Sequence, residues 1–500
     1  MHARLIHAAV AEQAHIRPAA PALIDGCEHL DYATLDAASD VYAQELAAAG
    51  VRPGIVVPVL LPRSSRLAVA LLAVLKCGAA YAALDRRWPQ ERVAHVTAAL
   101  RSPVLVTDES GPGLWSPPAA SLARVAARRT AAPAPDIGPD APAAVFFTSG
   151  TTGTPKGVLS PHRATTRLFG GPGAFADFGP GRVVLQAAPP AWDAFSMELW
   201  GPLTSGGTCV IAPGDYLLPD TLADLVAGSG VDTVWLTSTV FNLFVDEDDP
   251  RRPCFAGVRQ VLTGGERLSP EHVARFLARY PETVLTNGYG PVESCVFATT
   301  HRVTAADCVR AGGVPIGTPV HGTAVHLLDG DRPAAPGDRA EICLSGDGLA
   351  DGYLNAPEET AAAFPTVVLG GAPVRVYRTG DLGHLDADGV LHFHGRADRQ
   401  VKISGHRIEP AEVEAAARGI PGVREAVVVP IAAKSGGYER LAMFYTAEED
   451  GDPGSRAVRR ALAALLPAHL VPRTVEHRAA LPTTANGKLD HRSLSASLCT

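Results

Sequence analysis

Two patterns of apolar and polar positions recur along the chain: short apolar runs and longer segments with one apolar face. The segment between Ser64 and Gly78 shows the second pattern, with four leucines on one side of a predicted helix that Ser64 can cap and Gly78 can end. The run Ala144–Thr148 shows the first pattern and has the length and composition of a strand. Helices and strands alternate at the spacing typical of parallel sheets, which predicts an α/β fold.

The pattern changes in the C-terminal fifth of the chain. A strand pair around a D-x-D-G turn leads through a charged segment to a helix that Pro410 can begin. A β-rich stretch and a helix near 454–466 follow. We therefore expect a large N-terminal domain over residues 1–397 and a small C-terminal domain over residues 398–500, with the boundary near Asp398.

Four of the predicted strands end in polar loops, as expected for strands that present a binding site. In open α/β sheets, ligands bind beyond the carboxyl ends of the strands. We therefore expect these loops to converge on one cleft. The loops contain Ser149, Asp193, the pair Gly264 and Gly265, and the group Asn287, Tyr289 and Glu293.

The loop after Ala144–Thr148 has the composition of a phosphate-binding loop. Five hydroxyl side chains lie within seven residues, close to two glycines and one lysine. Hydroxyls, free backbone N–H groups and an ammonium group together suit phosphate oxygens. Pro155 precedes Lys156, so the loop is not a Walker loop, which requires glycine there.

Composition and charge exclude two classes of partner. The net charge is −8 and no basic stripe is present, which argues against a nucleic-acid partner. The longest apolar helical run, around Leu67–Leu75, is cut by Lys76 and is too short to cross a bilayer. The eight cysteines are widely spaced and form no C-x-x-C pair, which favours free thiols in a cytoplasmic protein.

Eight motifs occur in one order along almost the whole chain, and together they resemble the adenylation domains of non-ribosomal peptide synthetases. That family lies within the superfamily of acyl- and aryl-CoA synthetases and luciferases. Eight collinear motifs are far more specific than any single one. The motifs are LDYATL (30–35), LKCGAAYAALD (75–85), FTSGTTGTPKG (147–157), NGYGPVE (287–293), YRTGDL (377–382), GRADRQVKISGHRIE (395–409), LPAHLVP (466–472) and LPTTANGKLD (481–490).

The resemblance implies a fold and a reaction. The implied large domain has two helix-flanked sheets plus a distorted β-barrel, and the implied small α+β domain is mobile. In members of the family, the carboxylate of the substrate attacks the α-phosphate of ATP in the presence of Mg²⁺. Pyrophosphate is released and an acyl adenylate forms. The acyl adenylate then passes to the phosphopantetheine thiol of a carrier protein. For this chain the resemblance implies a carrier supplied in trans, since no carrier motif follows Asp490, and it leaves open the need for a small MbtH-like protein.

The resemblance also implies roles for individual residues. Lys156 would hold the departing phosphates, Lys488 would stabilise charge on the substrate carboxylate and α-phosphate, and Glu293 would hold Mg²⁺. Asp398 would be the hinge between the domains. Tyr289 would lie against the adenine, and Asp381 and Arg396 would bind the ribose. The implied nucleotide site comprises Thr148, Ser149, Thr151, Thr152, Gly265, Asn287, Tyr289, Asp381 and Arg396.

The same resemblance places an amino-acid pocket beside the nucleotide. Asp193 would bind the α-ammonium group, since a deep carboxylate needs a cation. The remaining positions carry no ionisable group, which excludes acidic and basic side chains, and two glycines are expected to open a pocket closed by larger residues. We expect a compact aliphatic substrate such as L-valine. The side-chain pocket comprises Ala194, Met197, Trp235, Leu262, Gly264, Gly288, Val296 and Phe297.

Four positions depart from the family pattern, and two alternatives remain. Val292 stands in place of a threonine, Ser404 of an arginine, Trp192 of a phenylalanine and Phe393 of a tyrosine. None of these changes removes a catalytic group. The first alternative is an acyl- or aryl-CoA ligase, which would leave the charge of Asp193 unpaired. The second is a silent binding homologue, which would be expected to lack one of the lysines or the metal carboxylate.

Overall fold

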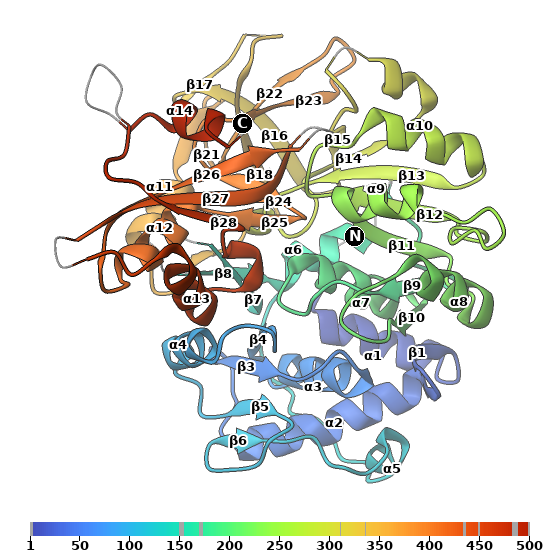
Figure 1. Ribbon diagram of the computed structural model, residues 1–500. Coiled ribbons are helices and arrows are strands. Elements are labelled where there is room, and N and C mark those ends of the chain that lie inside the picture. The colour runs from blue at the N-terminus through green and yellow to red at the C-terminus, as the bar shows by residue number, and fades with distance from the viewer. Residues whose placement is uncertain are drawn as a thin grey trace.

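The computed structural model describes residues 4–149, 155–169, 174–310, 312–335, 337–433, 437–448, 451–482 and 489–498. Two large sheets, an antiparallel sheet and a smaller C-terminal unit make up the molecule (Figure 1). The expected class, an α/β protein with a large N-terminal and a small C-terminal domain, is confirmed.

The first sheet has seven strands in the order β19-β8-β7-β4-β3-β5-β6. Its centre is parallel, and β8 and β19 add antiparallel pairs at one edge. Helix α4 packs against β3 of this sheet, and α5 packs against α2 (Tyr32–Ala48). The elements are β3 (Val56–Leu60), β4 (Ala80–Ala83), α4 (Gln90–Leu100), β5 (Leu105–Thr107), β6 (Leu114–Trp115), α5 (Leu122–Ala126), β7 (Pro142–Thr148), β8 (Lys156–Pro161) and β19 (Gly352–Tyr353).

The second sheet has nine strands in the order β15-β14-β13-β12-β11-β9-β10-β1-β2. Strands β1 and β9 to β13 form its parallel centre, and the pairs at both ends are antiparallel. The strands are β1 (Pro21–Asp25), β2 (Glu28–Asp31), β9 (Val183–Gln186), β10 (Thr208–Ile211), β11 (Thr233–Thr237), β12 (Gln260–Gly264), β13 (Val284–Tyr289), β14 (Thr299–Arg302) and β15 (Thr318–Pro319).

Helices of the large domain pack between and around these sheets. One apolar core joins α1, α2, α3 and α7 to strands of both sheets. The helices are α1 (Ile6–Ile16), α2 (Tyr32–Ala48), α3 (Ser65–Lys76), α6 (His162–Thr166), η1 (Arg167–Phe169), α7 (Asp193–Ser205), α8 (Pro219–Ser229), α9 (Ser238–Asp246), α10 (Pro270–Arg279), η2 (Val292–Ser294), η3 (Ala305–Val309) and α11 (Pro357–Ala363).

Helix α3 forms between the Ser64 cap and Gly78, as the sequence predicts, but its burial is not limited to the leucine face. Ser64 caps the helix by accepting a hydrogen bond from the Leu67 backbone N–H. Every residue of the helix except Arg66 is buried, because α2 packs against this helix and the positions between the leucines are alanine and valine. Lys76 is therefore buried and forms ion pairs with two aspartates of α2, at 2.6 Å from Asp36 and also with Asp40.

The third sheet is built from strands between residues 323 and 396. Its five strands are antiparallel in the order β17-β16-β18-β22-β23, and Leu391 of β23 also pairs with Gly317 through an isolated antiparallel bridge. A separate hairpin, β20 with β21, lies beside it. The strands are β16 (Thr323–Asp329), β17 (Arg332–Pro333), β18 (Ala340–Gly346), β20 (Thr366–Leu369), β21 (Ala372–Arg375), β22 (Tyr377–Leu385) and β23 (Leu391–Arg396).

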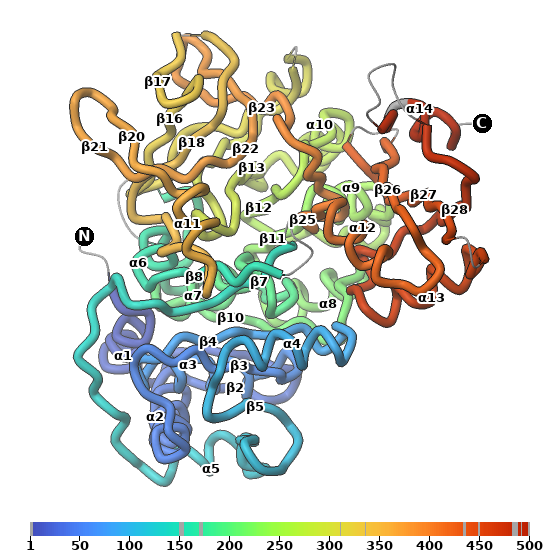
Figure 2. The backbone as a smooth tube through the Cα atoms, turned by 90° about the vertical axis from the view of Figure 1, so that its left-hand side faces the viewer, coloured from blue at the N-terminus to red at the C-terminus, as the bar shows by residue number. Residues whose placement is uncertain are grey.

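The C-terminal unit has its own apolar core, built from residues 401–494. A hairpin of β24 and β25 precedes a three-stranded sheet with helices against it (Figure 2). No helix in the described parts of the chain is long and apolar enough to cross a membrane. The elements are β24 (Val401–Ile403), β25 (His406–Ile408), α12 (Pro410–Arg418), β26 (Val423–Ala432), β27 (Tyr438–Ala447), α13 (Ser455–Leu465), η4 (Ala468–Leu470), β28 (Thr474–His477) and α14 (His491–Ala496).

Candidate active site

The structure brings most of the predicted site residues to one cleft at the carboxyl ends of β7, β12 and β13 and the start of α7. A cavity of about 160 Å³ lies there, and the adjoining cleft has a volume of about 1040 Å³. The predicted residues that line one or both are Thr148, Ser149, Asp193, Ala194, Trp235, Gly265, Asn287, Gly288, Tyr289, Val296, Phe297, Asp381, Arg396 and Asp398.

Asp193 is the first residue of α7, and it lines the cavity. Its carboxylate accepts hydrogen bonds from the backbone N–H groups of Ala194, at 2.9 Å, and Val296, at 3.0 Å. Burial raises the pKa of Asp193, and the two N–H donors only partly offset this effect. Among the described residues it forms no ion pair, so no direct cationic partner for this carboxylate lies in that part of the chain.

The side-chain pocket is lined by Ala194, Trp235, Gly288, Val296 and Phe297. Met197 and Leu262, also predicted here, are buried in the apolar cluster behind that lining.

The two glycines act differently from the expectation that they open the pocket. A Cβ on Gly264 would lie 2.1 Å from the carbonyl oxygen of Gly288, and a Cβ on Gly288 would lie 2.2 Å from the ring of Phe297. Their missing side chains therefore allow the neighbouring strand and Phe297 to approach closely, because any Cβ would overlap with them.

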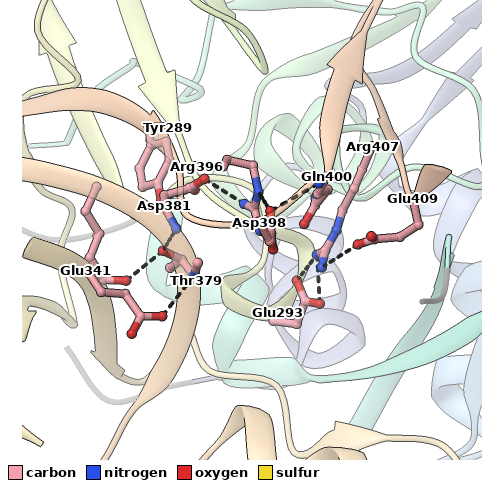
Figure 3. A network of polar contacts seen from close by, with 12 residues as sticks. Tyr289, Glu293, Glu341, Thr379, Asp381, Arg396, Asp398, Gln400, Arg407 and Glu409 are labelled. Atoms are coloured by element: carbon pink, nitrogen blue, oxygen red, sulfur yellow. Dashed lines mark hydrogen bonds and ion pairs between the residues drawn. The ribbon is translucent and has the colours of Figure 1, made fainter. Parts of the chain in front are cut away.

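The part of the cleft around Asp381 contains a chain of hydrogen bonds (Figure 3). Tyr289 donates its hydroxyl hydrogen to Asp381 at 2.6 Å, and Arg396 donates to the other oxygen of Asp381 at 2.6 Å. Arg396 also donates twice to Asp398, at 2.7 Å each. Each Asp381 oxygen keeps lone-pair capacity, so the carboxylate can still accept hydrogen bonds from hydroxyl groups.

The predicted phosphate loop lies between β7 and β8 in the sequence. At its two ends, Thr148 of β7 pairs with Lys156 of β8. The Lys156 ammonium lies 5.3 Å from the ring centroid of Tyr353. Ser149 donates to the backbone carbonyl of Arg407 at 2.8 Å. Three predicted residues, Thr151, Thr152 and Lys488, lie outside the described residues.

Glu293 is fully buried on η2 and is held by two side chains. Arg407 Nη1 lies 2.9 Å from both carboxylate oxygens (Figure 3). The Tyr353 hydroxyl donates to Glu293 at 2.8 Å. Burial alone would raise the pKa of Glu293, but the charge of Arg407 and the hydrogen bond from Tyr353 lower it below its usual range. A carboxylate so deeply buried requires a cation, which fits the residue type expected to hold Mg²⁺.

The hairpin β24–β25 contributes residues to the cleft that sequence reasoning missed. Lys402 lines both cavities, and burial lowers its pKa. The two-residue turn consists of Ser404, at φ 52°, and Gly405, at φ 81°, and the Gly405 N–H donates to Glu266 at 2.8 Å. The available sequence signal was a motif with two cationic residues, Lys402 and Arg407, on short apolar strands.

A stack of rings secures this hairpin against both domains. His406 stacks on His469 with centroids 3.7 Å apart, and its ring meets Trp192 edge to face at 4.6 Å. Burial lowers the pKa of His406 to about 4, and the nearby charge of Arg87 lowers it further whereas Asp85 opposes it. Trp192, where the family pattern has phenylalanine, thus contacts the hairpin from the large domain.

The cleft thus brings together the Asp381 carboxylate, the two ends of the threonine-rich loop and the deeply buried carboxylate of Glu293. The chain belongs to the AMP-binding enzyme family, whose family model matches residues 10–354. The model of the AMP-binding enzyme C-terminal domain matches residues 412–488. The resemblance to non-ribosomal peptide synthetase adenylation domains is confirmed.

Curated relatives are much longer proteins, and this chain spans less than half the length of each one named here. Malpibaldin synthetase of Mortierella alpina is 37% identical over 97% of this chain, which covers 9% of that protein. Phosphinothricin tripeptide synthetase PhsC of Streptomyces viridochromogenes is 36% identical over 99% of this chain and 45% of its own length.

A solved structure of similar fold is holo-PA1221, described as an NRPS protein containing adenylation and PCP domains. It has a TM-score of 0.87 at 34% identity, and the match covers 98% of this chain and 84% of PA1221. The amide bond synthetase McbA from Marinactinospora thermotolerans has a TM-score of 0.81 at 24% identity, over 99% of each chain, which shows a shared fold.

Proposed function

We propose that the chain activates a compact aliphatic L-amino acid, L-valine or a close analogue, as the aminoacyl adenylate and then transfers it to the phosphopantetheine thiol of a carrier protein. The observation that carries the amino-acid assignment is Asp193. This carboxylate is deep, accepts two backbone N–H groups, forms no ion pair in the described residues and lies beside Ala194, Trp235, Val296 and Phe297 in the cavity lining. An α-ammonium group would supply the missing cation, whereas a fatty or aryl acid would not.

Residues of the matching motifs suit each part of the proposed first step, although Thr151, Thr152 and Lys488 lie outside the described residues. Asp381 would accept hydrogen bonds from the ribose hydroxyls, with Arg396 beside it and Tyr289 against the adenine. Lys156, Ser149, Thr151 and Thr152 would hold the leaving phosphates. The further proposed contacts are those of Thr148, Gly265 and Asn287 with the nucleotide, and that of Lys488 with the reacting carboxylate and α-phosphate.

Glu293 would hold Mg²⁺ during this step. The metal supplies charge neutralisation for the phosphate oxygens. In the arrangement described above, Arg407 already neutralises Glu293. We call the arrangement in which the β24–β25 hairpin packs in the cleft the seated arrangement. Glu293 then has Arg407 as its cation, and it needs another cation when the hairpin withdraws. This supports two positions of the C-terminal domain, with Asp398 as the proposed hinge.

The seated hairpin suits the second step, in which a thiol attacks the adenylate. An outer basin of about 830 Å³ lies between the two domains and is lined by arginines. Such a cationic basin fits the phosphodiester of a phosphopantetheine arm. A carrier partner is also supported by the PCP domain of PA1221. The arginines that line the basin are Arg87, Arg456, Arg459, Arg460 and Arg473.

The test is ATP–pyrophosphate exchange measured with each common amino acid in turn. L-Valine should give the highest rate, with isoleucine, leucine and 2-aminobutyrate weaker, because one methylene changes discrimination by only about 1–3 kcal/mol. A polar, charged or aromatic best substrate would refute the pocket assignment. Exchange with fatty or aryl acids alone would instead support the CoA-ligase alternative, and no exchange with any acid would support the silent homologue.

A further inference from the structure

Arg167 is a buried arginine that forms no ion pair with a carboxylate in the described residues. It lies on η1 and is 5% exposed. Its guanidinium donates instead to backbone carbonyls of Ala164 at 2.7 Å, Ser294 at 2.8 Å and Phe297 at 2.9 Å. Burial lowers its pKa to about 10, so the group stays charged at neutral pH. Burying a cation whose partners are mainly neutral carbonyls costs free energy. That cost suggests that the guanidinium serves to hold these carbonyls in place.

The carbonyls of Ser294 and Phe297 belong to a short loop with unusual backbone geometry. Cys295 has φ 39° and Val296 has φ 61°, which places two consecutive residues with side chains in the left-handed region. A β-branched residue such as Val296 is rarely found there. Strain of this kind persists only where the surroundings impose it. Arg167 binds the carbonyl before this pair and the carbonyl after it, and it lies 3.4 Å from the Cys295 carbonyl oxygen.

The strained loop is also the part of the site that orients Asp193. The N–H of Val296 donates to Asp193 at 3.0 Å, and Val296 and Phe297 line the side-chain pocket. Glu293 immediately precedes the loop. One guanidinium, bound to carbonyls within residues 294–297, therefore fixes the backbone that positions the carboxylate facing the substrate.

We propose that Arg167 is a positioning residue for substrate recognition: it holds the strained 294–297 backbone so that the Val296 N–H aims Asp193 at the α-ammonium group. This inference rests on the proposed amino-acid substrate. Loss of the guanidinium fork lets the loop relax, and Asp193 then loses its fixed direction. The selectivity for an amino acid over the same acid without its amino group falls, while nucleotide binding is retained.

The variant Arg167→Lys keeps the charge but cannot reach several carbonyls at once. Gly348→Ala provides a second route to the same perturbation, because a Cβ there would lie 2.3 Å from Arg167 Nη2 and would push the guanidinium from its seat. The matched control is Arg163→Lys. Arg163 also binds carbonyls, those of Asp347 and Leu349, at 2.7 and 2.9 Å, but none of the pocket loop.

Two measurements are made on each variant of the whole chain. Amide hydrogen exchange of residues 294–298 reports the loop directly and needs no substrate. ATP–pyrophosphate exchange with L-valine and with 3-methylbutanoate, its analogue without the amino group, reports selectivity. Arg167→Lys and Gly348→Ala should speed exchange of these amides, raise the KM for L-valine by about tenfold and lower the L-valine preference similarly, with the ATP KM nearly unchanged. Arg163→Lys should change none of these.

Unchanged amide exchange in both variants overturns the inference, whatever the activity. An equal loss of rate for both acids, with the ratio preserved, also overturns it, because that result indicates a structural role alone. If none of the amino acids supports ATP–pyrophosphate exchange in the wild-type protein, the proposed function fails. The amide measurement then still decides whether Arg167 holds the loop.

Discussion

Removing Arg407 should separate the two proposed half-reactions. In Arg407→Ala, Glu293 would remain fully buried with only the Tyr353 hydroxyl, among its described partners, as a side-chain donor while the hairpin is seated. Breaking a buried ion pair by removing one partner typically costs about 3–5 kcal/mol. We take the lower end, about 3 kcal/mol, because Tyr353 stays and the Arg407 side chain is 21% exposed. That penalty falls on the seated arrangement and corresponds to a loss of population of roughly 100-fold.

The assay compares two rates in the same variant. Transfer from preformed aminoacyl adenylate to a carrier, measured in a single turnover, should fall by roughly 100-fold. ATP–pyrophosphate exchange should stay close to wild type, because Glu293 is then free to bind the metal. Arg440→Ala serves as the control, since Arg440 pairs only with the exposed Glu439 in the described structure. Equal losses in both reactions, or unaltered transfer, would refute the assignment of Arg407 to the transfer arrangement.

Four further predictions concern other parts of the cleft. Gly405→Ala should slow carrier loading more than adenylation, because its Cβ would lie 2.4 Å from Thr237 Cγ2; equal effects on both rates would contradict the seated hairpin. Lys488→Ala should abolish most pyrophosphate exchange while transfer from preformed adenylate continues, and loss of both would refute its assignment. Because burial lowers the pKa of His406 to about 4, the seated arrangement binds fewer protons than a released one. The population of the seated arrangement, read from loading rates relative to exchange rates, should fall by up to about tenfold per pH unit as the pH drops from 6.5 toward 4, and a flat ratio would disprove this. Trp235→Ala should shift exchange toward larger side chains, and an unchanged substrate profile would place Trp235 outside the pocket.

The sequence predicted the elements whose chemistry is local. Helix α3, the helix begun by Pro410 and the strand ends near Ser149 and Asn287 all follow from apolar pattern, capping residues and polar loops. These signals lie within a few residues of one another. The fold class was predictable for the same reason.

Features that depend on distant contacts were not predictable in this way. Lys402 and Arg407 look like solvated charges on a short hairpin, and only the packing of that hairpin against Thr237 and Glu266 brings them into the cleft. Arg167 likewise resembles any surface arginine, although its partners in the pocket loop lie more than 120 residues away. The pairing of Leu391 with Gly317 likewise joins residues more than 70 positions apart, which no local pattern encodes.

The central claim is that Asp193 selects an amino acid through its α-ammonium group. The most direct test is ATP–pyrophosphate exchange with L-valine and with 3-methylbutanoate, in the wild type and in Asp193→Ala. The wild type should prefer L-valine by at least roughly 100-fold, because 3-methylbutanoate leaves a deep carboxylate without its cation. Asp193→Ala should lose most of this preference while still accepting 3-methylbutanoate. Equal use of both acids by the wild type, or an unchanged preference in the variant, would contradict the account.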